Sequence, residues 1–121
     1  MPNLNRLMIV DDSSMMRKLI TRTLTSIECD IIGEASNGAE ALELYKELKP
    51  DLVTMDITMR GMDGFAAAQS ILEFDDKAKI LFLSNLDDDK YREMVVEVGG
   101  VGMAKKHHSD EIEMLIKAID K

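Results

Sequence analysis

Two kinds of apolar segment alternate along the chain, and this alternation constrains the fold more than any other feature of the sequence. Five short apolar runs occupy residues 6–10, 29–35, 51–55, 79–84 and 101–105. After each run comes a longer stretch in which apolar residues recur at positions i, i+3, i+4 and i+7. That spacing is typical of one face of an α-helix. The pattern predicts five β-strands that alternate with five α-helices.

The composition of the runs predicts a parallel sheet. Runs 6–10, 51–55 and 79–84 are almost entirely apolar, as expected of strands that helices cover on both faces. Right-handed β-α-β connections place helices on both sides of such a sheet. We predict one doubly wound α/β domain over residues 1–121, with its core at about 6–120. The expected fold is a flavodoxin-like (βα)5 arrangement with the strand order 2-1-3-4-5.

Two helices carry more detailed expectations. The first should turn Met16, Leu19, Ile20 and Leu24 toward the core, because these residues share one helical face. Ser109, followed by an acidic residue and an apolar stretch, is the predicted N-cap of the last helix.

The charge of the chain limits its partners. Fifteen Lys and Arg residues against 23 Asp and Glu residues give a formal net charge of −8. Such a chain repels phosphate backbones and anionic membranes, so we expect no direct nucleic-acid binding. The sequence also lacks an apolar stretch of membrane-spanning length and a secretory signal. We therefore expect a cytoplasmic protein without membrane insertion.

The residues at the ends of the runs are the candidate functional residues, because ligands of open α/β sheets bind at the carboxyl ends of the strands. The polar residues that end or follow four of the runs are Asp11 and Asp12, Asp56, Ser84, and Lys105 and Lys106. The predicted strand order brings them to one rim.

The three carboxylates at this rim predict a metal ion. Adjacent strands lie only about 4.8 Å apart, so Asp11, Asp12 and Asp56 would repel one another unless a cation lay between them. Carboxylate oxygens favour Mg²⁺, or Mn²⁺ in its place. A calcium site is less well supported, because the sequence has no D-x-D-x-D-G loop.

A carboxylate beside a metal, a hydroxyl and an ammonium group predicts phosphoryl transfer onto the carboxylate. Asp56 is the expected nucleophile, because it stands alone on the central strand, whereas Asp11 and Asp12 form a pair suited to hold metal. Each residue alone has a plainer interpretation. Asp12 would be a helix cap, Asp56 and Ser84 turn residues, and Lys106 a solvated charge. Their occurrence together at consecutive rim positions favours the functional interpretation.

Four segments resemble, in order, the motifs of the receiver domain of two-component response regulators, the CheY-like family: MIVDDSSMMRKLI, PDLVTMDITMRGMDGF, ILFLSN and GGVGMAKK. The resemblance runs from Leu7 to the last helix. It implies that Asp56 is the phosphoacceptor, that Asp11 and Asp12 hold Mg²⁺, and that Ser84 is the switch hydroxyl. It also implies that Lys106 contacts the phosphate and that the backbone carbonyl of Thr58 is a metal ligand.

Three positions depart from the family pattern. Met103 stands where the family usually has Tyr or Phe, whose ring moves inward when the switch hydroxyl moves. A flexible methionine is not expected to make such a movement between two defined positions. His107 replaces a proline that commonly follows a cis bond, so the bond after Lys106 should be trans. Arg60 replaces a further proline common in the family. We expect His107 and His108 to be solvated and not to bind metal.

These observations predict a stand-alone signalling receiver that catalyses only its own phosphorylation and dephosphorylation and is not otherwise an enzyme. A histidine kinase or phosphotransfer protein would supply the phosphate, and an unidentified output protein would read it. The receiver itself should be a monomer or weak dimer, and chemotaxis is one option for its pathway. The alternatives are a receiver excised from a larger regulator, a phosphate sink, and a Mg²⁺-dependent phosphohydrolase. The last normally has a second acid two residues after the nucleophile, where this chain has Thr58.

Overall fold

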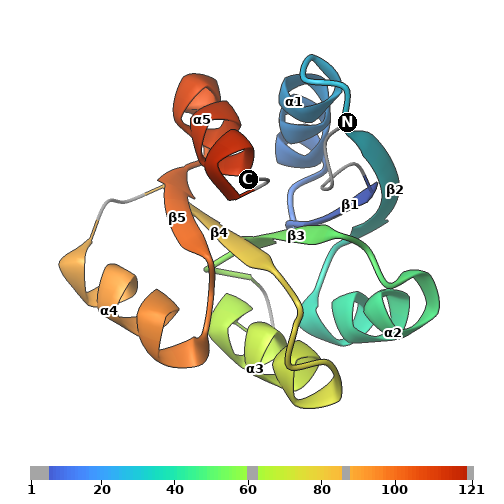
Figure 1. Cartoon of the computed structure of the whole chain (residues 1–121), viewed down its shortest axis with the longest axis vertical. Helices are drawn as coiled ribbons and strands as arrows, with labels where there is room; N and C mark the ends of the chain where they lie inside the picture. The colour runs from blue at the N-terminus through green and yellow to red at the C-terminus, as the bar shows by residue number, and fades with distance from the viewer. Residues whose placement is uncertain (1–5, 60–62, 86–87, 120–121) are drawn as a thin grey trace.

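Strands and helices alternate throughout the chain, as the sequence predicts (Figure 1). A computed structural model describes residues 6–59, 63–85 and 88–119. In chain order the elements are β1 (Arg6–Val10), α1 (Ser14–Thr25), β2 (Asp30–Ala35), α2 (Gly38–Leu48), β3 (Leu52–Asp56), α3 (Gly64–Phe74), β4 (Ile80–Ser84), α4 (Asp89–Val98), β5 (Gly102–Lys105) and α5 (Ser109–Ile119).

The sheet has the predicted topology. Its strands lie in the order β2-β1-β3-β4-β5, and every pair is parallel. Helices α1 and α5 cover one face, and α2, α3 and α4 cover the other (Figure 1). The doubly wound α/β fold is therefore confirmed.

The two faces of the sheet carry separate apolar cores, because successive strand residues point to opposite sides. On β1, Met8 and Val10 belong to the core under α2, α3 and α4. Leu7 and Ile9 belong to the core that α1 and α5 cover. Since β3 and β4 are also buried on both faces, their ends are held firmly in place.

Two detailed expectations for the helices were wrong. Leu19 is 39% exposed, because α1 turns a narrower face to the sheet, on which Ile20 and Leu24 are fully buried. Ser109 is the first residue of α5 and not its cap. The Ile112 N–H donates to the carbonyl of His108 (3.1 Å), which places the cap one residue earlier.

Candidate functional site

Four of the predicted site residues lie at the carboxyl ends of four strands that are adjacent in the sheet. Asp11 follows β1, Asp56 is the last residue of β3, Ser84 is the last residue of β4, and Lys106 follows β5. All four are buried. Since β1, β3, β4 and β5 are neighbours in the sheet, residues up to 95 positions apart in the sequence meet at one rim.

Lys106 lies between two buried carboxylates. Its Nζ is 2.9 Å from Oδ2 of Asp11 and 2.9 Å from Oδ1 of Asp56. The Thr58 N–H also donates to Oδ1 of Asp56 (3.2 Å). One oxygen of Asp56 is thus held by the protein, which fixes the orientation of its carboxylate.

Burial has the largest effect on the pKa of the Asp56 carboxyl group. Burial raises the pKa of Asp56 from the ordinary 3.8 to about 6, although contact with Lys106 lowers it; the charge of Asp11 adds to the increase. Burial also lowers the pKa of Lys106, but its contacts with Asp11 and Asp56 outweigh this and raise it above its ordinary value. The lysine is therefore charged, and its contact with Asp56 does not fully offset the effect of burial on the pKa of that carboxyl group.

The acidic cluster fits a hard divalent cation. Asp11, Asp12 and Asp56 each offer an oxygen, and these oxygens lie within 4.8 Å of one another. Oδ2 of Asp56 is buried and has no hydrogen-bond partner among the residues that the structure describes. An orphaned buried carboxylate oxygen is costly unless a cation or donor meets it. Oxygen donors of this kind suit Mg²⁺.

The plainer interpretation of Asp12 does not hold, because another residue caps α1. The N-cap is Ser13, whose hydroxyl accepts a hydrogen bond from the Met16 N–H (3.3 Å). Asp11 supports the same turn, because its Oδ1 accepts from the Ser13 N–H (2.9 Å). The exposed Asp12 lines two hollows at this edge, one of them shared with Asp56.

The hollow at the rim has a volume of about 450 Å³. Its lining includes the predicted residues Asp12, Asp56, Thr58, Ser84 and Lys106, and five others: Ser13, Met16, Asn85, Tyr91 and His107. Tyr91 is the residue that sequence reasoning missed most clearly. Tyr91 lies in the first turn of α4 and packs partly against the core, and the spacing of apolar residues does not show that this turn borders the rim.

Gly64 sets the position of the Asp56 backbone. A Cβ atom at this position would lie 2.1 Å from the carbonyl oxygen of Asp56 and 2.9 Å from Cα of Ile57. The Gly64 N–H donates to the carbonyl of Ile57 (2.8 Å). Only a residue without a side chain lets α3 begin this close to the end of β3.

The structure describes two of the three positions that depart from the family pattern, Met103 and His107. Met103 is buried on β5, opposite Phe82 of β4. The bond between Lys106 and His107 is trans, as predicted. Both histidines are exposed, and His108 lies 3.4 Å from Glu111. Within the described ranges the only candidate metal cluster is the aspartate group. Arg60 lies outside the described residues.

Comparisons with known proteins agree on one family. A family model described as the response regulator receiver domain matches residues 7–120. The chain is 46% identical over 92 residues to the chemotaxis protein CheY of Thermotoga maritima, covering 76% of this chain and 74% of the relative. It is 37% identical over 117 residues to CheY of Bacillus subtilis, covering 97% and 96%.

A solved structure supports the same assignment. A chain in the crystal structure of the CheX-CheY-BeF3-Mg complex from Borrelia burgdorferi superposes with a TM-score of 0.89 and 31% identity. The match covers 94% of this chain and 87% of that chain. Among the helices that the structure describes, none is long and apolar enough to cross a membrane.

Proposed function

Since this chain belongs to the response regulator receiver domain family of two-component signalling, we propose that it is a switch that accepts a phosphoryl group on Asp56. The phosphate would come from a histidine kinase or a phosphotransfer protein. An output protein would then read the phosphorylated state. The chain would catalyse only its own phosphorylation and dephosphorylation.

The observation that carries this proposal is the environment of the Asp56 carboxylate. Lys106 and the Thr58 N–H hold Oδ1, whereas Oδ2 has no such partner among the described residues. The rim hollow that Asp56 lines also has Ser84 and Lys106 in its wall. A nucleophilic oxygen, an ammonium group and a hydroxyl therefore border one space large enough for a phosphoryl group.

The chemistry proposed is an in-line displacement at phosphorus. A carboxylate oxygen of Asp56 forms the new P–O bond, and the bond between phosphorus and the donor breaks with its electron pair leaving on the donor. Lys106 and Ser84 would then hold phosphoryl oxygens. Asp11, Asp12, Asp56 and the carbonyl of Thr58 would hold Mg²⁺. When bound, the cation would neutralise part of the negative charge on the phosphoryl group during its transfer.

Phosphorylation adds negative charge to a site whose main counter-charge is Lys106. We expect Lys106 and Ser84 to be drawn toward the phosphoryl group, which shifts an existing equilibrium in the β4-α4 and β5 region. A partner that binds one of the two states better would read the switch.

Intact-mass measurement after incubation with acetyl phosphate and Mg²⁺ tests the proposal. We expect one phosphoryl adduct on the parent chain, and a much smaller yield when EDTA removes the metal. The D56N variant should give none. The matched control D30N changes an exposed aspartate at the start of β2 and should keep the adduct. An unmodified parent chain, or an adduct that survives in D56N, would refute the assignment. Turnover of small phosphate esters would favour a phosphohydrolase instead.

A further inference from the structure

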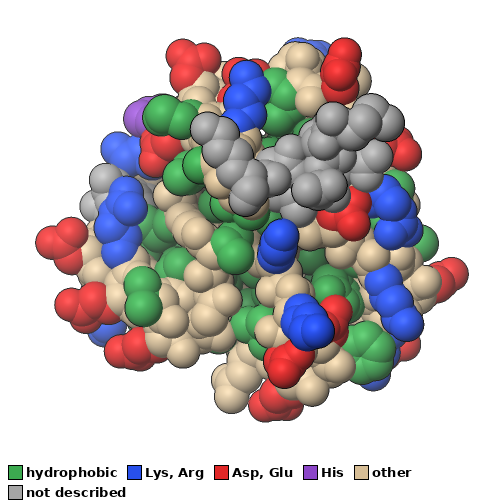
Figure 2. All heavy atoms as spheres, in the orientation of Figure 1, with side chains coloured by type: hydrophobic (Ala, Val, Ile, Leu, Met, Phe, Trp, Pro, Cys, Tyr) green, Lys and Arg blue, Asp and Glu red, His purple; other side chains and the backbone are tan. Residues whose placement is uncertain are grey.

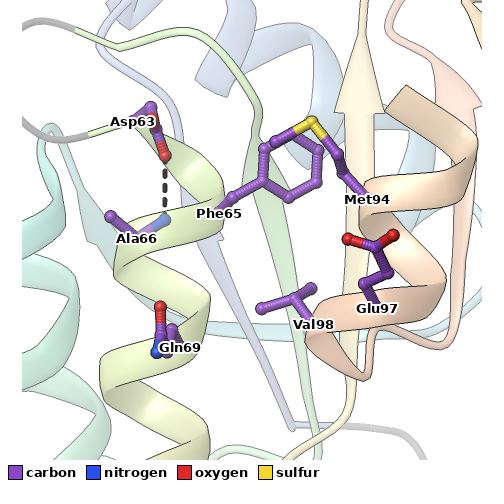
Figure 3. Close-up of a pocket in the computed structure, with 7 residues that line it drawn as sticks. All are labelled: Asp63, Phe65, Ala66, Gln69, Met94, Glu97 and Val98. Atoms are coloured by element: carbon purple, nitrogen blue, oxygen red, sulfur yellow. Dashed lines mark hydrogen bonds between the residues drawn. The ribbon is translucent and has the colours of Figure 1, made fainter. Parts of the chain in front are cut away.

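A second hollow lies away from the acceptor rim, between helices α3 and α4 (Figure 3). Its volume is about 530 Å³, which is within the range of ligand-binding clefts. Phe65 points from α3 toward α4, and Met94 and Val98 point from α4 back toward α3 (Figure 3). We call this hollow the α3-α4 groove. It shares no lining residue with the acceptor hollow.

The floor of the α3-α4 groove is apolar and held in place from below. Phe65 is only 8% exposed. Its ring packs on Phe82 with the centroids 5.0 Å apart and on Tyr91 at 6.1 Å. Met94 and Val98 are half-buried against the same core. A ligand in the groove would therefore contact an aromatic ring that is already fixed in position and, beside it, a flexible methionine side chain.

The rim of the α3-α4 groove is acidic. The lining includes the carboxylates of Asp63 and Glu97, and no Lys or Arg appears among the described residues that line it. Asp63 also caps α3, because its Oδ1 accepts a hydrogen bond from the Ala66 N–H (2.8 Å) (Figure 3). Acidic side chains also project from the edge of the molecule where α4 lies (Figure 2).

The hollow on α5 offers a useful contrast. It is lined by Asp110 and Glu113 together with Lys117, so its charges are of both signs. The α3-α4 groove combines an apolar floor with carboxylates of one sign, and this combination selects an occupant that is apolar on one side and cationic at its edges.

We propose that the α3-α4 groove is a docking surface for a basic amphipathic helix of a partner protein. One or two apolar side chains of the helix would lie on Phe65, Met94 and Val98, and its Lys or Arg side chains would pair with Asp63 and Glu97. The groove runs between two helices, so a third helix can lie along it and bury its apolar face. This surface shares no lining residue with the acceptor hollow, although Phe65 of its floor packs on Tyr91, which lines that hollow.

A designed peptide tests the proposal without knowledge of the natural partner. The probe is a helix of about 15 residues with Leu on one face and Lys on the other, added to the isotope-labelled chain near physiological ionic strength. We expect NMR shifts that centre on Phe65, Met94 and Val98. A peptide with Glu in place of every Lys should cause none, because its charge matches that of the rim.

Charge reversal at the rim gives the decisive comparison. E97K should weaken binding of the Lys peptide about fivefold, a modest factor because exposed ion pairs are individually weak. E47K makes the same charge change at an exposed position of α2 outside the groove and should leave the affinity within about twofold. M94Q should weaken binding through the floor without a change of charge.

Several results would overturn the proposal. One is a set of peptide-induced shifts centred on the acceptor rim or on α5. Another is an equal loss of affinity in E97K and E47K, which would show that only the net charge attracts the peptide. Comparable binding of the Glu peptide would contradict the charge argument as well. Circular dichroism of each variant confirms that the helices remain folded.

Discussion

Replacement of Gly64 by alanine should damage both the fold and the proposed acceptor site. The added Cβ would lie 2.1 Å from the Asp56 carbonyl oxygen, whereas ordinary contacts begin at 3.4 Å, so the backbone must move by about 1 Å. The neighbouring atoms belong to the backbone of β3 and not to a flexible side chain. Overpacking of this kind costs about 1–3 kcal/mol of folding free energy. A misplacement of about 1 Å at a reacting group costs up to about 100-fold in rate.

Urea unfolding and the rate of phosphorylation by acetyl phosphate measure the two effects of G64A. We expect a lower urea midpoint of unfolding, with an unchanged slope of the unfolding free energy against urea concentration. We also expect slower formation of the phosphoryl adduct. The matched control is G102A, because a Cβ there would meet only the end of the Leu81 side chain at 3.4 Å. G102A should differ from the parent by less than about 1 kcal/mol. A G64A chain with the parent's midpoint and phosphorylation rate would refute this account of how β3 and α3 position Asp56.

Three further predictions follow from single side chains. Replacement of Thr58 by Glu or Gln should change the lifetime of the phosphoryl group but still allow its Mg²⁺-dependent formation. The decay of the adduct after removal of the donor measures this, and one lifetime across the series would contradict it. K106M should lower the metal-free free energy of unfolding by about 3 kcal/mol, because two buried carboxylates lose their counter-charge. Mg²⁺ should then raise its melting temperature more than the parent's, and equal shifts would count against this. In Y45F, the pKa of Asp75, lowered chiefly by the Tyr45 hydroxyl (2.8 Å), should return toward its ordinary value. Because a lowered carboxyl pKa stabilises the fold above the unfolded pKa, the difference in stability between parent and Y45F should shrink as the solution becomes acidic. An NMR titration in which the Asp75 pKa is unchanged would show that this hydrogen bond is not its cause.

The sequence was sufficient for the topology and for the gathering of the rim residues, because both follow from the order of the elements. Once five strands alternate with helices, few arrangements keep the connections right-handed and short. In the order 2-1-3-4-5, the ends of β1, β3, β4 and β5 are necessarily neighbours. Asp11, Asp56, Ser84 and Lys106 then meet even though their positions in the sequence are far apart.

The sequence was insufficient where the outcome depends on how a helix is tilted and rotated on the sheet. Helical spacing identifies an apolar stripe but not its width, and so Leu19 was assigned to the core although it is 39% exposed. For the same reason, Tyr91 was not predicted to line the rim hollow, because an apolar stripe on a helix does not show which of its residues reaches past the end of the sheet. The α3-α4 groove was not predicted for a related reason: it depends on the space left between α3 and α4, and the spacing of apolar residues does not give that space.

The cavity lining suggests how the proposed switch would work without an aromatic residue at position 103. Met103 lies opposite Phe82 and has no ring that turns between two discrete positions. Tyr91, in contrast, lines the acceptor hollow together with Ser84, and its ring also packs on Phe65 of α3. Movement of Ser84 toward a phosphoryl group would change the space beside the Tyr91 ring. We therefore expect the phosphorylated state to be transmitted into α4 through Tyr91, at the edge of the sheet where α3 and α4 meet.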